Sequence, residues 1–341
     1  MLLSSTVGGI TALLATGGFL LRRRISRNWI SQSSIRVPKF TKEQTIIITG
    51  GNTGLGYEAA KYLARGGGKI ILACRNGDAG ERAALEIRES TGNKDVNFLK
   101  LDLASLSSVR SFATDFKTRN EKVHALVCNA GVWVPDDQKT KTNDGYEIHF
   151  GVNHLGHFAL IQSLIPHMEQ SGMDSRIVIV SSSLSKSGKI DLQKRDFIYD
   201  GRVPEADAKK SFAPTGYCDS KLLNMMTCRE LAVKLRGSNI TTYAVSPGFC
   251  SSQLGRNVQM PVYKKMLVAP LMRLFQRSSK KGALNIVFAV TEDKTKLESG
   301  TMYQDGKVWK DGVNLIDTLG DDLQKGLWEL SEELIKEKNE I

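Results

Sequence analysis

The sequence lacks the residue patterns of a disulfide-stabilised or zinc-binding protein. Its five cysteines are an odd number without a CxxC pair, namely Cys74, Cys128, Cys218, Cys228 and Cys250. This usage fits a reducing compartment with mostly buried free thiols. The five histidines offer no defensible metal-ligand spacing with nearby acids, so we predict no metal site. Because no internal repeat and no low-complexity linker follow residue 45, we expect one folded domain.

Acidic residues are missing from two segments, and this absence explains the positive charge of the chain. The formal net charge is +11, yet residues 1–40 and residues 261–281 each hold six Arg and Lys and no acid. The rest of the chain is therefore close to neutral. A nucleic-acid-binding protein usually spreads basic side chains over its folded body, so we predict no nucleic-acid partner. With 41% hydrophobic and 24% charged residues, the composition also excludes a disordered chain and a polytopic membrane protein.

Residues 1–21 contain no charge and no proline. A helix of that length spans about 30 Å, enough to cross a bilayer core. Three arginines follow at 22–24, which predicts a membrane anchor over 1–21, a basic linker over 22–41 and a cytosol-facing domain over 42–341. We expect location in the endoplasmic reticulum membrane. A mitochondrial presequence stays open, because residues 22–36 are rich in Arg and Ser. A cleaved secretory peptide and a helix buried in the domain are disfavoured.

From Thr45 the chain alternates short apolar runs with longer helical stretches. The predicted strands are Thr45–Thr49, Lys69–Ala73, Val96–Lys100, Ala125–Cys128, Arg176–Ser181, Ile240–Val245 and Thr301–Tyr303. The predicted helices are Glu58–Arg65, Gly80–Ser90, Ser105–Lys117, Tyr146–Ser171, Tyr217–Leu235 and Lys280–Val290. This alternation predicts right-handed crossovers and a parallel sheet covered on both faces. We therefore expect an α/β fold with a single doubly wound domain, a tail from about Asp305 onward and a separate N-terminal hydrophobic helix.

A glycine-rich stretch follows the first predicted strand directly and precedes a helix. Glycine permits a tight turn close to a pyrophosphate, and the helix N-terminus offers N–H donors. The glycines fall at 50, 54 and 56, which differs from the GxGxxG spacing. The strand–turn–helix context nevertheless predicts a dinucleotide site at Gly50, Asn52, Thr53, Gly54, Leu55 and Gly56.

Residues at the ends of later strands complete the predicted cofactor site. Arg75 follows the second strand, where an acidic residue would favour NAD and an arginine accommodates the 2′-phosphate of NADP(H). We therefore predict NADP(H) as the cofactor. Asp102 and Leu103 end the third strand and are assigned to the adenine side. Three residues follow the fourth strand and would close the nicotinamide side of the site, namely Asn129, Ala130 and Gly131.

Tyr217 and Lys221 are four residues apart in a helical stretch, so their side chains share one helix face. A tyrosine with its ordinary pKa of about 10 needs help to exchange a proton at neutral pH. A cation one turn away favours the phenolate, which suits Tyr217 to general acid/base catalysis on an alcohol or carbonyl. Ser182, after the fifth strand, can hold the substrate oxygen beside Tyr217. Asn153 can support a water chain from Lys221 to solvent.

These motifs resemble those of short-chain dehydrogenases/reductases. The matching strings are TGGNTGLG at Thr49–Gly56, NAG at Asn129–Gly131, Asn153, Ser182, YCDSK at Tyr217–Lys221 and PG at Pro247–Gly248. The resemblance implies a Rossmann-type fold and a catalytic tetrad of Asn153, Ser182, Tyr217 and Lys221. In it the tyrosine passes the proton, the serine orients the carbonyl, and the lysine binds the ribose and lowers the tyrosine pKa. Pro247, Gly248 and Ser252 would lie near the nicotinamide.

Within that family the chain is most similar to the membrane-anchored retinol dehydrogenases. The strings ILACRN, LDLASL, DGYEIHFGVNHLGHF and PGFCSSQLGR carry this likeness. Two features depart from it: Ser246 stands where those enzymes usually have His, and a charged insert spans residues 194–210. Both bear on retinoid specificity rather than on hydride chemistry.

Residues 261–281 mix apolar residues with cations, and the family resemblance implies a substrate lid there. An apolar face with basic flanks also fits a helix on an anionic membrane surface. A lid that packs on the domain and is basic only outside is equally compatible. With the anchor, membrane contact would turn the substrate site toward the bilayer, where retinoids, steroids and fatty aldehydes dissolve.

Together these features predict an NADP(H)-dependent oxidoreductase that interconverts a lipophilic alcohol and its carbonyl. Retinol/retinal is the first candidate pair, and steroid or lipid-aldehyde reduction is the alternative within the family. A non-catalytic nucleotide-sensing scaffold is a further alternative, which the intact set of four catalytic-type residues disfavours. A homodimer is compatible with the sequence.

Overall fold

A computed structural model describes residues 26, 28–119, 121–202, 213–251, 254 and 276–338 of the chain. Within them one eight-stranded sheet has the order β3-β2-β1-β4-β5-β6-β7-β8. Its strands are β1 Thr45–Thr49, β2 Lys69–Cys74, β3 Val96–Lys100, β4 Val123–Cys128, β5 Ser175–Val180, β6 Ile240–Val245, β7 Thr301–Gln304 and β8 Lys307–Val308. Neighbouring strands are parallel except for the pair β7 and β8. The predicted α/β, doubly wound sheet is confirmed, with an antiparallel edge strand added.

The strand order places a topological switch point between β1 and β4. The chain starts at β1 in the middle of the sheet, runs outward to β3, and returns to begin the other half at β4. Crossovers on either side of such a point leave a crevice at the carboxyl ends of the strands, where α/β sheets bind ligands. We therefore expect the ligand-binding residues in the loops after β1, β4, β5 and β6.

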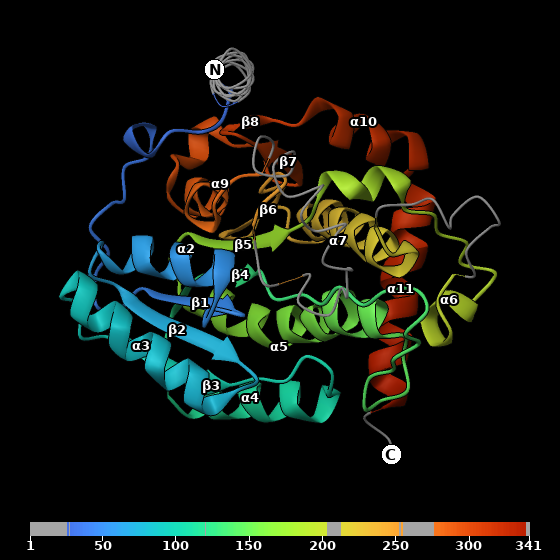
Figure 1. The fold of residues 1–341 in the computed structure, drawn as a ribbon, viewed down its shortest axis with the longest axis horizontal. Helices are drawn as coiled ribbons and strands as arrows, with labels where there is room; N and C mark the ends of the chain where they lie inside the picture. Colours follow the sequence, from blue (N-terminus) through green and yellow to red (C-terminus); the bar gives the residue numbers. More distant parts are fainter. Residues whose placement is uncertain are drawn as a thin grey trace, which may run out of the picture.

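Helices cover both faces of the sheet (Figure 1). The described helices are α2 Gly54–Ala64, α3 Gly77–Thr91, α4 Leu106–Thr118, α5 Gly156–Gln170, α6 Asp196–Tyr199, α7 Thr215–Lys234, α9 Ser279–Thr291, α10 Lys310–Leu319 and α11 Asp321–Glu337. Short 3-10 turns occur at η1 Gln32–Ser34, η3 Ser183–Ser187 and η6 Lys294–Lys296, and a π-helical turn at η2 Phe150–Leu155. The predicted helix over 146–171 thus begins with a π-turn.

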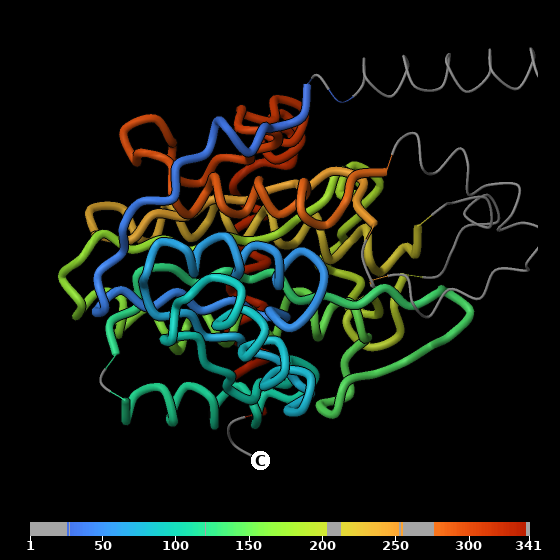
Figure 2. The backbone as a smooth tube through the Cα atoms, turned by 60° about the vertical axis from the view of Figure 1, so that its left-hand side comes forward, coloured from blue at the N-terminus to red at the C-terminus, as the bar shows by residue number. Residues whose placement is uncertain are grey.

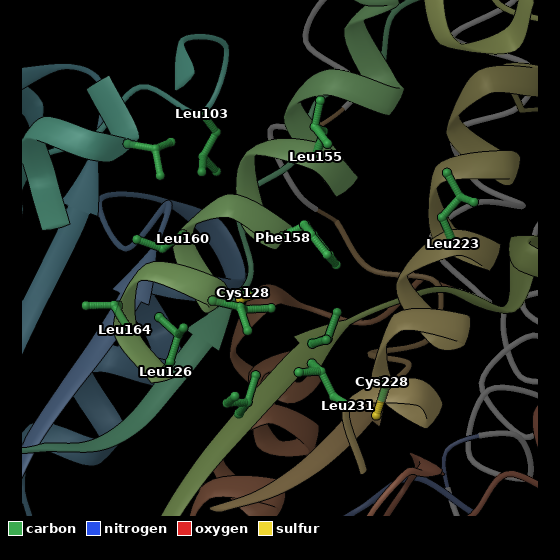
Figure 3. Packing of buried hydrophobic residues seen from close by; sticks show 14 of the residues in the cluster. Leu103, Leu126, Cys128, Leu155, Phe158, Leu160, Leu164, Leu223, Cys228 and Leu231 are labelled. Carbon is green, nitrogen blue, oxygen red and sulfur yellow. The ribbon is translucent and has the colours of Figure 1, made fainter. Parts of the chain in front are cut away.

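Each face of the sheet has its own hydrophobic core. In β1, Ile47 packs with α4, α5, α7 and α11, whereas Ile46 and Ile48 pack with α2, α3 and α9. Because consecutive strand side chains point to opposite faces, both must be apolar, which explains the uninterrupted hydrophobic runs. Figure 3 shows the first core, where Leu126 of β4 lies between the strands and helix α5.

The predicted tail from Asp305 is wrong, because the C-terminal residues form part of the first core. Helix α11 places Leu327, Leu330 and Leu334 against α5 and α7. These apolar residues recur every three or four positions, so they share one helix face. The Trp328 ring packs edge-on against Phe158, with 4.8 Å between the ring centroids.

Part of the predicted linker 22–41 packs on the body of the protein. Figure 2 shows this blue segment beside the red C-terminal region. The backbone N–H of Ile30 donates to Asp305 Oδ1 at 3.2 Å, and the guanidinium of Arg277 lies 4.7 Å from the centre of the Trp29 ring. No helix in the described ranges is long and apolar enough to span a bilayer. The predicted anchor over 1–21 lies outside those ranges.

Candidate active site

The glycine-rich loop between β1 and α2 has the backbone geometry of a close-approach turn. Gly50 and Gly54 have φ angles of +64° and +60°, which side-chain-bearing residues rarely adopt. A Cβ on Gly56 would lie 2.5 Å from the carbonyl oxygen of Gly50 and 2.5 Å from Asn129 Nδ2. Thr53, at the N-cap of α2, makes no side-chain hydrogen bond to the first turn as described. The N–H groups at the N-terminus of α2 can donate to a pyrophosphate, and the glycines let it approach the backbone closely.

A hydrogen-bond network centred on Thr49 joins this loop to the end of β4. The Thr49 hydroxyl accepts from the backbone N–H of both Asn129 and Ala130 at 2.9 Å, and it lies 2.9 Å from His157 Nε2. His157 Nδ1 lies 3.1 Å from the carbonyl oxygen of Asn153 and donates to it. Burial lowers the pKa of His157 to about 4, so the ring is neutral. Thr49 and His157 were not predicted as members of the site. A threonine ending the first strand, directly before the glycines, was the available signal.

The predicted adenine-side residues lie at the ends of β2 and β3. Arg75 is exposed directly after β2, and the N–H of Gly50 donates to the Ala73 carbonyl at 2.8 Å, which holds the glycine loop beside this strand end. The carboxylate of Asp102 accepts from the N–H of Ala104 at 3.0 Å, and Leu103 is buried. The Arg75 side chain is thus exposed to solvent, two residues after the Ala73 carbonyl that holds the glycine-rich loop.

Tyr217 and Lys221 lie on the first turns of α7, in a buried environment. Tyr217 is 6% exposed, and the Lys221 ammonium is 5.5 Å from its ring centroid. Burial raises the pKa of Tyr217, and a hydrogen bond with the Ser182 side chain opposes this rise. Burial likewise lowers the pKa of Lys221 to about 8, and its Nζ donates to the Val180 carbonyl at 2.9 Å. In this structure burial therefore opposes the predicted phenolate and keeps Tyr217 protonated.

Asn153 lies in the π-turn that precedes α5 and is fully buried. Its Oδ1 accepts from the N–H of Val132 at 2.8 Å, and its Nδ2 donates to the Ser220 hydroxyl at 3.0 Å. That hydroxyl donates in turn to the carbonyl of Tyr217 at 2.8 Å. π-turns occur frequently at functional sites. The side chain thus joins the segment after Gly131 to the helix that carries Tyr217.

The loop after β6 contains the predicted residues Pro247 and Gly248. Gly248 has a φ of +74°, and a Cβ there would lie 2.6 Å from the Arg277 guanidinium carbon. Ser246 is buried, and its hydroxyl has no hydrogen-bond partner in the described part of the chain. Ser252, most of the predicted lid (261–275) and residues 203–210 of the insert lie outside the described residues.

Three aromatic and charged residues near Tyr217 were also missed. The Trp133 ring lies 4.6 Å from the Tyr217 ring, centroid to centroid, and the His149 ring lies 6.3 Å away. Glu147 accepts a hydrogen bond from His149. The two ring contacts with Tyr217 join residues that are 68 or more positions apart, so sequence spacing gave no signal for them.

A doubly wound sheet with a glycine-rich strand–turn–helix at its switch point is an architecture that binds dinucleotides. Residues 44–193 match the family model described as short chain dehydrogenase. Retinol dehydrogenase 11 of Mus musculus is 37% identical over 288 residues, covering 83% of each chain. Retinol dehydrogenase 14 of Mus musculus is 33% identical over 347 residues, covering 98% of this chain and 99% of that protein.

Solved structures share the fold. An uncharacterized protein from Mycobacterium paratuberculosis has a TM-score of 0.63 at 28% identity, covering 88% of this chain and 96% of that chain. The chain belongs to the short-chain dehydrogenase/reductase family. It is an oxidoreductase of that family, whose cofactor class is NAD(P)(H).

Proposed function

We propose that this enzyme uses NADPH to reduce a lipophilic aldehyde or ketone, with retinal as the first candidate. The observation that carries the proposal is the meeting of Ser182 and Lys221 with the buried Tyr217, at the same edge of the parallel sheet as the glycine-rich loop. A protonated tyrosine is ready to donate to a carbonyl oxygen, which supports reduction. The similarity to retinol dehydrogenases supports a lipophilic substrate.

In this proposal some residues of the site bind the cofactor and the substrate, and Tyr217 transfers the proton. The loop 50–56 and the N-terminus of α2 hold the pyrophosphate, and Arg75 faces the 2′-phosphate. When bound, NADPH supplies the hydride. Ser182 holds the substrate carbonyl oxygen, Tyr217 donates the proton from its hydroxyl, and Lys221 binds the ribose. Asn153 keeps the first turns of α7 in place through Ser220.

Residues 1–21 serve as a retained anchor in this proposal, with the catalytic domain facing the cytosol from the endoplasmic reticulum. Their uncharged composition and the following arginines support it. Residues 261–281 then lie toward the anionic membrane surface and admit a substrate dissolved in the bilayer. Alkaline carbonate extraction of the full-length protein tests the anchor. Release into the supernatant would contradict it.

A substrate panel tests the proposed reaction. Membrane fractions that contain the full-length enzyme are assayed for NADPH consumption with all-trans-retinal, a 3-ketosteroid and a long-chain aldehyde. We expect retinal to give the highest kcat/KM. A preference for the steroid or the aldehyde would contradict retinal as the substrate but not carbonyl reduction as the reaction. Tight NADPH binding without turnover of any carbonyl would favour the nucleotide-sensing scaffold.

A further inference from the structure

The segment that follows Gly131 contacts the surroundings of Tyr217 through alternate residues. The N–H of Val132 donates to Asn153 Oδ1, and the N–H of Val134 donates to His149 Nε2 at 3.0 Å. The Asp136 carboxylate accepts from the N–H of Thr215, the first residue of α7, at 3.0 Å. Between these contacts, the Trp133 ring packs on the Tyr217 ring. The segment therefore contacts α7 at Thr215 and at Tyr217 itself.

The pair of Glu147, which is largely buried, and His149, which is buried, completes this environment. Because His149 Nε2 accepts from Val134, the imidazole proton lies on Nδ1, which donates to Glu147 Oε1 at 2.6 Å. The second carboxylate oxygen accepts from the N–H of Phe150 at 2.7 Å. The His149 ring meets the Tyr217 ring edge-on, at an interplanar angle of 81°. The pair thus fixes one ring against the tyrosine with every polar atom of the contact satisfied.

The backbone of α7 comes close to this pair at Gly216. Gly216 directly precedes Tyr217, and a Cβ there would lie 2.9 Å from His149 Nδ1 and 3.0 Å from Glu147 Oε1. Any larger residue would separate the helix from the pair. Three observations therefore converge on the same point: a determined tautomer, an edge-on ring contact and a glycine at the place of closest approach.

We propose that Glu147 and His149 are positioning residues that hold the Tyr217 ring in the orientation from which its hydroxyl reaches the substrate oxygen. The inference rests on the proposed function of Tyr217 as the proton donor. Small displacements of a reacting group lower the rate steeply, because proton transfer depends on hydrogen-bond geometry. Neither residue touches the reacting atoms in this account; both act through the tyrosine.

Glu147→Gln is the most informative variant. A carboxylate accepts from both His149 Nδ1 and the Phe150 N–H, whereas an amide offers one accepting oxygen and one donating nitrogen. If the amide oxygen faces Phe150, the His149 proton moves to Nε2 and meets the Val134 N–H. If the oxygen faces His149, the amide nitrogen meets the Phe150 N–H. Either arrangement leaves two donors facing each other, so an isosteric change disturbs the ring.

The test compares kcat, KM for NADPH and the solvent isotope effect on kcat in full-length wild type and Glu147→Gln. Rates are expressed per NADPH site titrated by fluorescence and measured with the best carbonyl of the panel above. We expect kcat to fall at least about ten-fold, KM for NADPH to change less than two-fold, and the solvent isotope effect to increase, because proton transfer becomes slower. An unchanged kcat per site and isotope effect would overturn the proposal.

Glu121→Gln is the matched control. Its carboxylate is 11% exposed against 13% for Glu147, and it pairs with Lys69 far from the strand ends that form the site. We expect it to leave kcat per site unchanged, and an equal loss in both variants would assign the effect to general destabilisation and overturn the proposal. A crystal structure of Glu147→Gln gives a readout without turnover. The Tyr217 ring should be displaced, and an unmoved ring would contradict the inference even if no carbonyl is reduced and the proposed function fails.

Discussion

Tyr217 is buried, and this environment favours the protonated form of its hydroxyl. Burial raises its pKa, and the hydrogen bond with Ser182 opposes this only in part. Lys221 is also buried, at 3% exposure, and its ammonium donates to the carbonyl of Val180, which holds it one helical turn from the tyrosine. A buried hydroxyl and a buried amine thus lie close together on one face of α7.

We expect Arg75 to decide the cofactor preference. Replacing it by aspartate, in Arg75→Asp, removes the cation that would face a 2′-phosphate and adds an acceptor for a ribose hydroxyl. We expect the ratio of kcat/KM for NADPH to that for NADH to fall at least about ten-fold, because one charge-assisted contact is worth about 1.5–3 kcal/mol. Steady-state kinetics with both cofactors measures the ratio.

Arg82→Asp is the control for this prediction. Arg82 is exposed on α3, so the substitution makes the same change in net charge away from the end of β2. Its cofactor ratio should match the wild type. A wild-type enzyme that prefers NADH would contradict the assignment of Arg75.

Several residues of the site could be predicted from the sequence, and others could not. Tyr217 and Lys221 follow from helical spacing, and the glycines from their place between a strand and a helix. The contacts of His149 and Trp133 with Tyr217 depend on how α7 packs on the loops after β4. Such contacts arise only from tertiary packing, so local patterns in the chain do not reveal them.

At the scale of the elements, the strands were predicted more accurately than the C-terminal helices. The runs at β1, β3 and β6 have the predicted bounds, because strands buried on both faces are continuously apolar. Helix α11 was missed because its charged residues dominate the composition, although its leucines recur at helical spacing. The packing of Ser331 on His154, with 2.9 Å between Oγ and Nε2, shows how closely it joins the core.

Leu334→Ala tests the structural role of α11. Leu334 is fully buried, and its carbonyl accepts from the Tyr146 hydroxyl at 3.2 Å. Removing the side chain leaves a cavity, and we expect the free energy of unfolding to fall by about 3 kcal/mol. Chemical denaturation of the purified protein measures it.

Leu85→Ala serves as the comparison, because Leu85 is 49% exposed on α3. Its loss should stay within about 0.5 kcal/mol, as is usual for surface substitutions. Equal stabilities of Leu334→Ala and the wild type would contradict the packing of α11.

For the whole molecule, the sheet topology brings distant residues to one edge. Asn153 lies in the crossover from β4 to β5, whereas Ser182 and Tyr217 lie in the crossover from β5 to β6. The parallel neighbours β4, β5 and β6 end at the same edge of the sheet, which brings these segments together. The alternation of strands and helices along the sequence predicted a doubly wound parallel sheet of this kind. The docking of Trp29 and Ile30 on Arg277 and Asp305 was not predicted, because it joins the two ends of the chain.

That docking also bears on where the molecule meets a membrane. Arg277 and Asp305 form a two-bonded ion pair that is almost fully buried, and Arg277 lies in 276–281, the described C-terminal end of the predicted lid. The chain that leads from the predicted anchor is therefore fastened beside the end of the lid segment. This arrangement supports a substrate site that is held near the bilayer.

The central claim is that Tyr217 donates the proton in an NADPH-dependent carbonyl reduction, and Tyr217→Phe tests it most directly. Tyr243→Phe is the matched control, since Tyr243 is also buried and its hydroxyl has no hydrogen-bond partner among the described residues. The measurement is kcat for NADPH-dependent retinal reduction per titrated NADPH site. We predict a loss of at least about a hundred-fold in Tyr217→Phe and none in Tyr243→Phe. A Tyr217→Phe enzyme that retains more than half of the wild-type kcat would contradict the account.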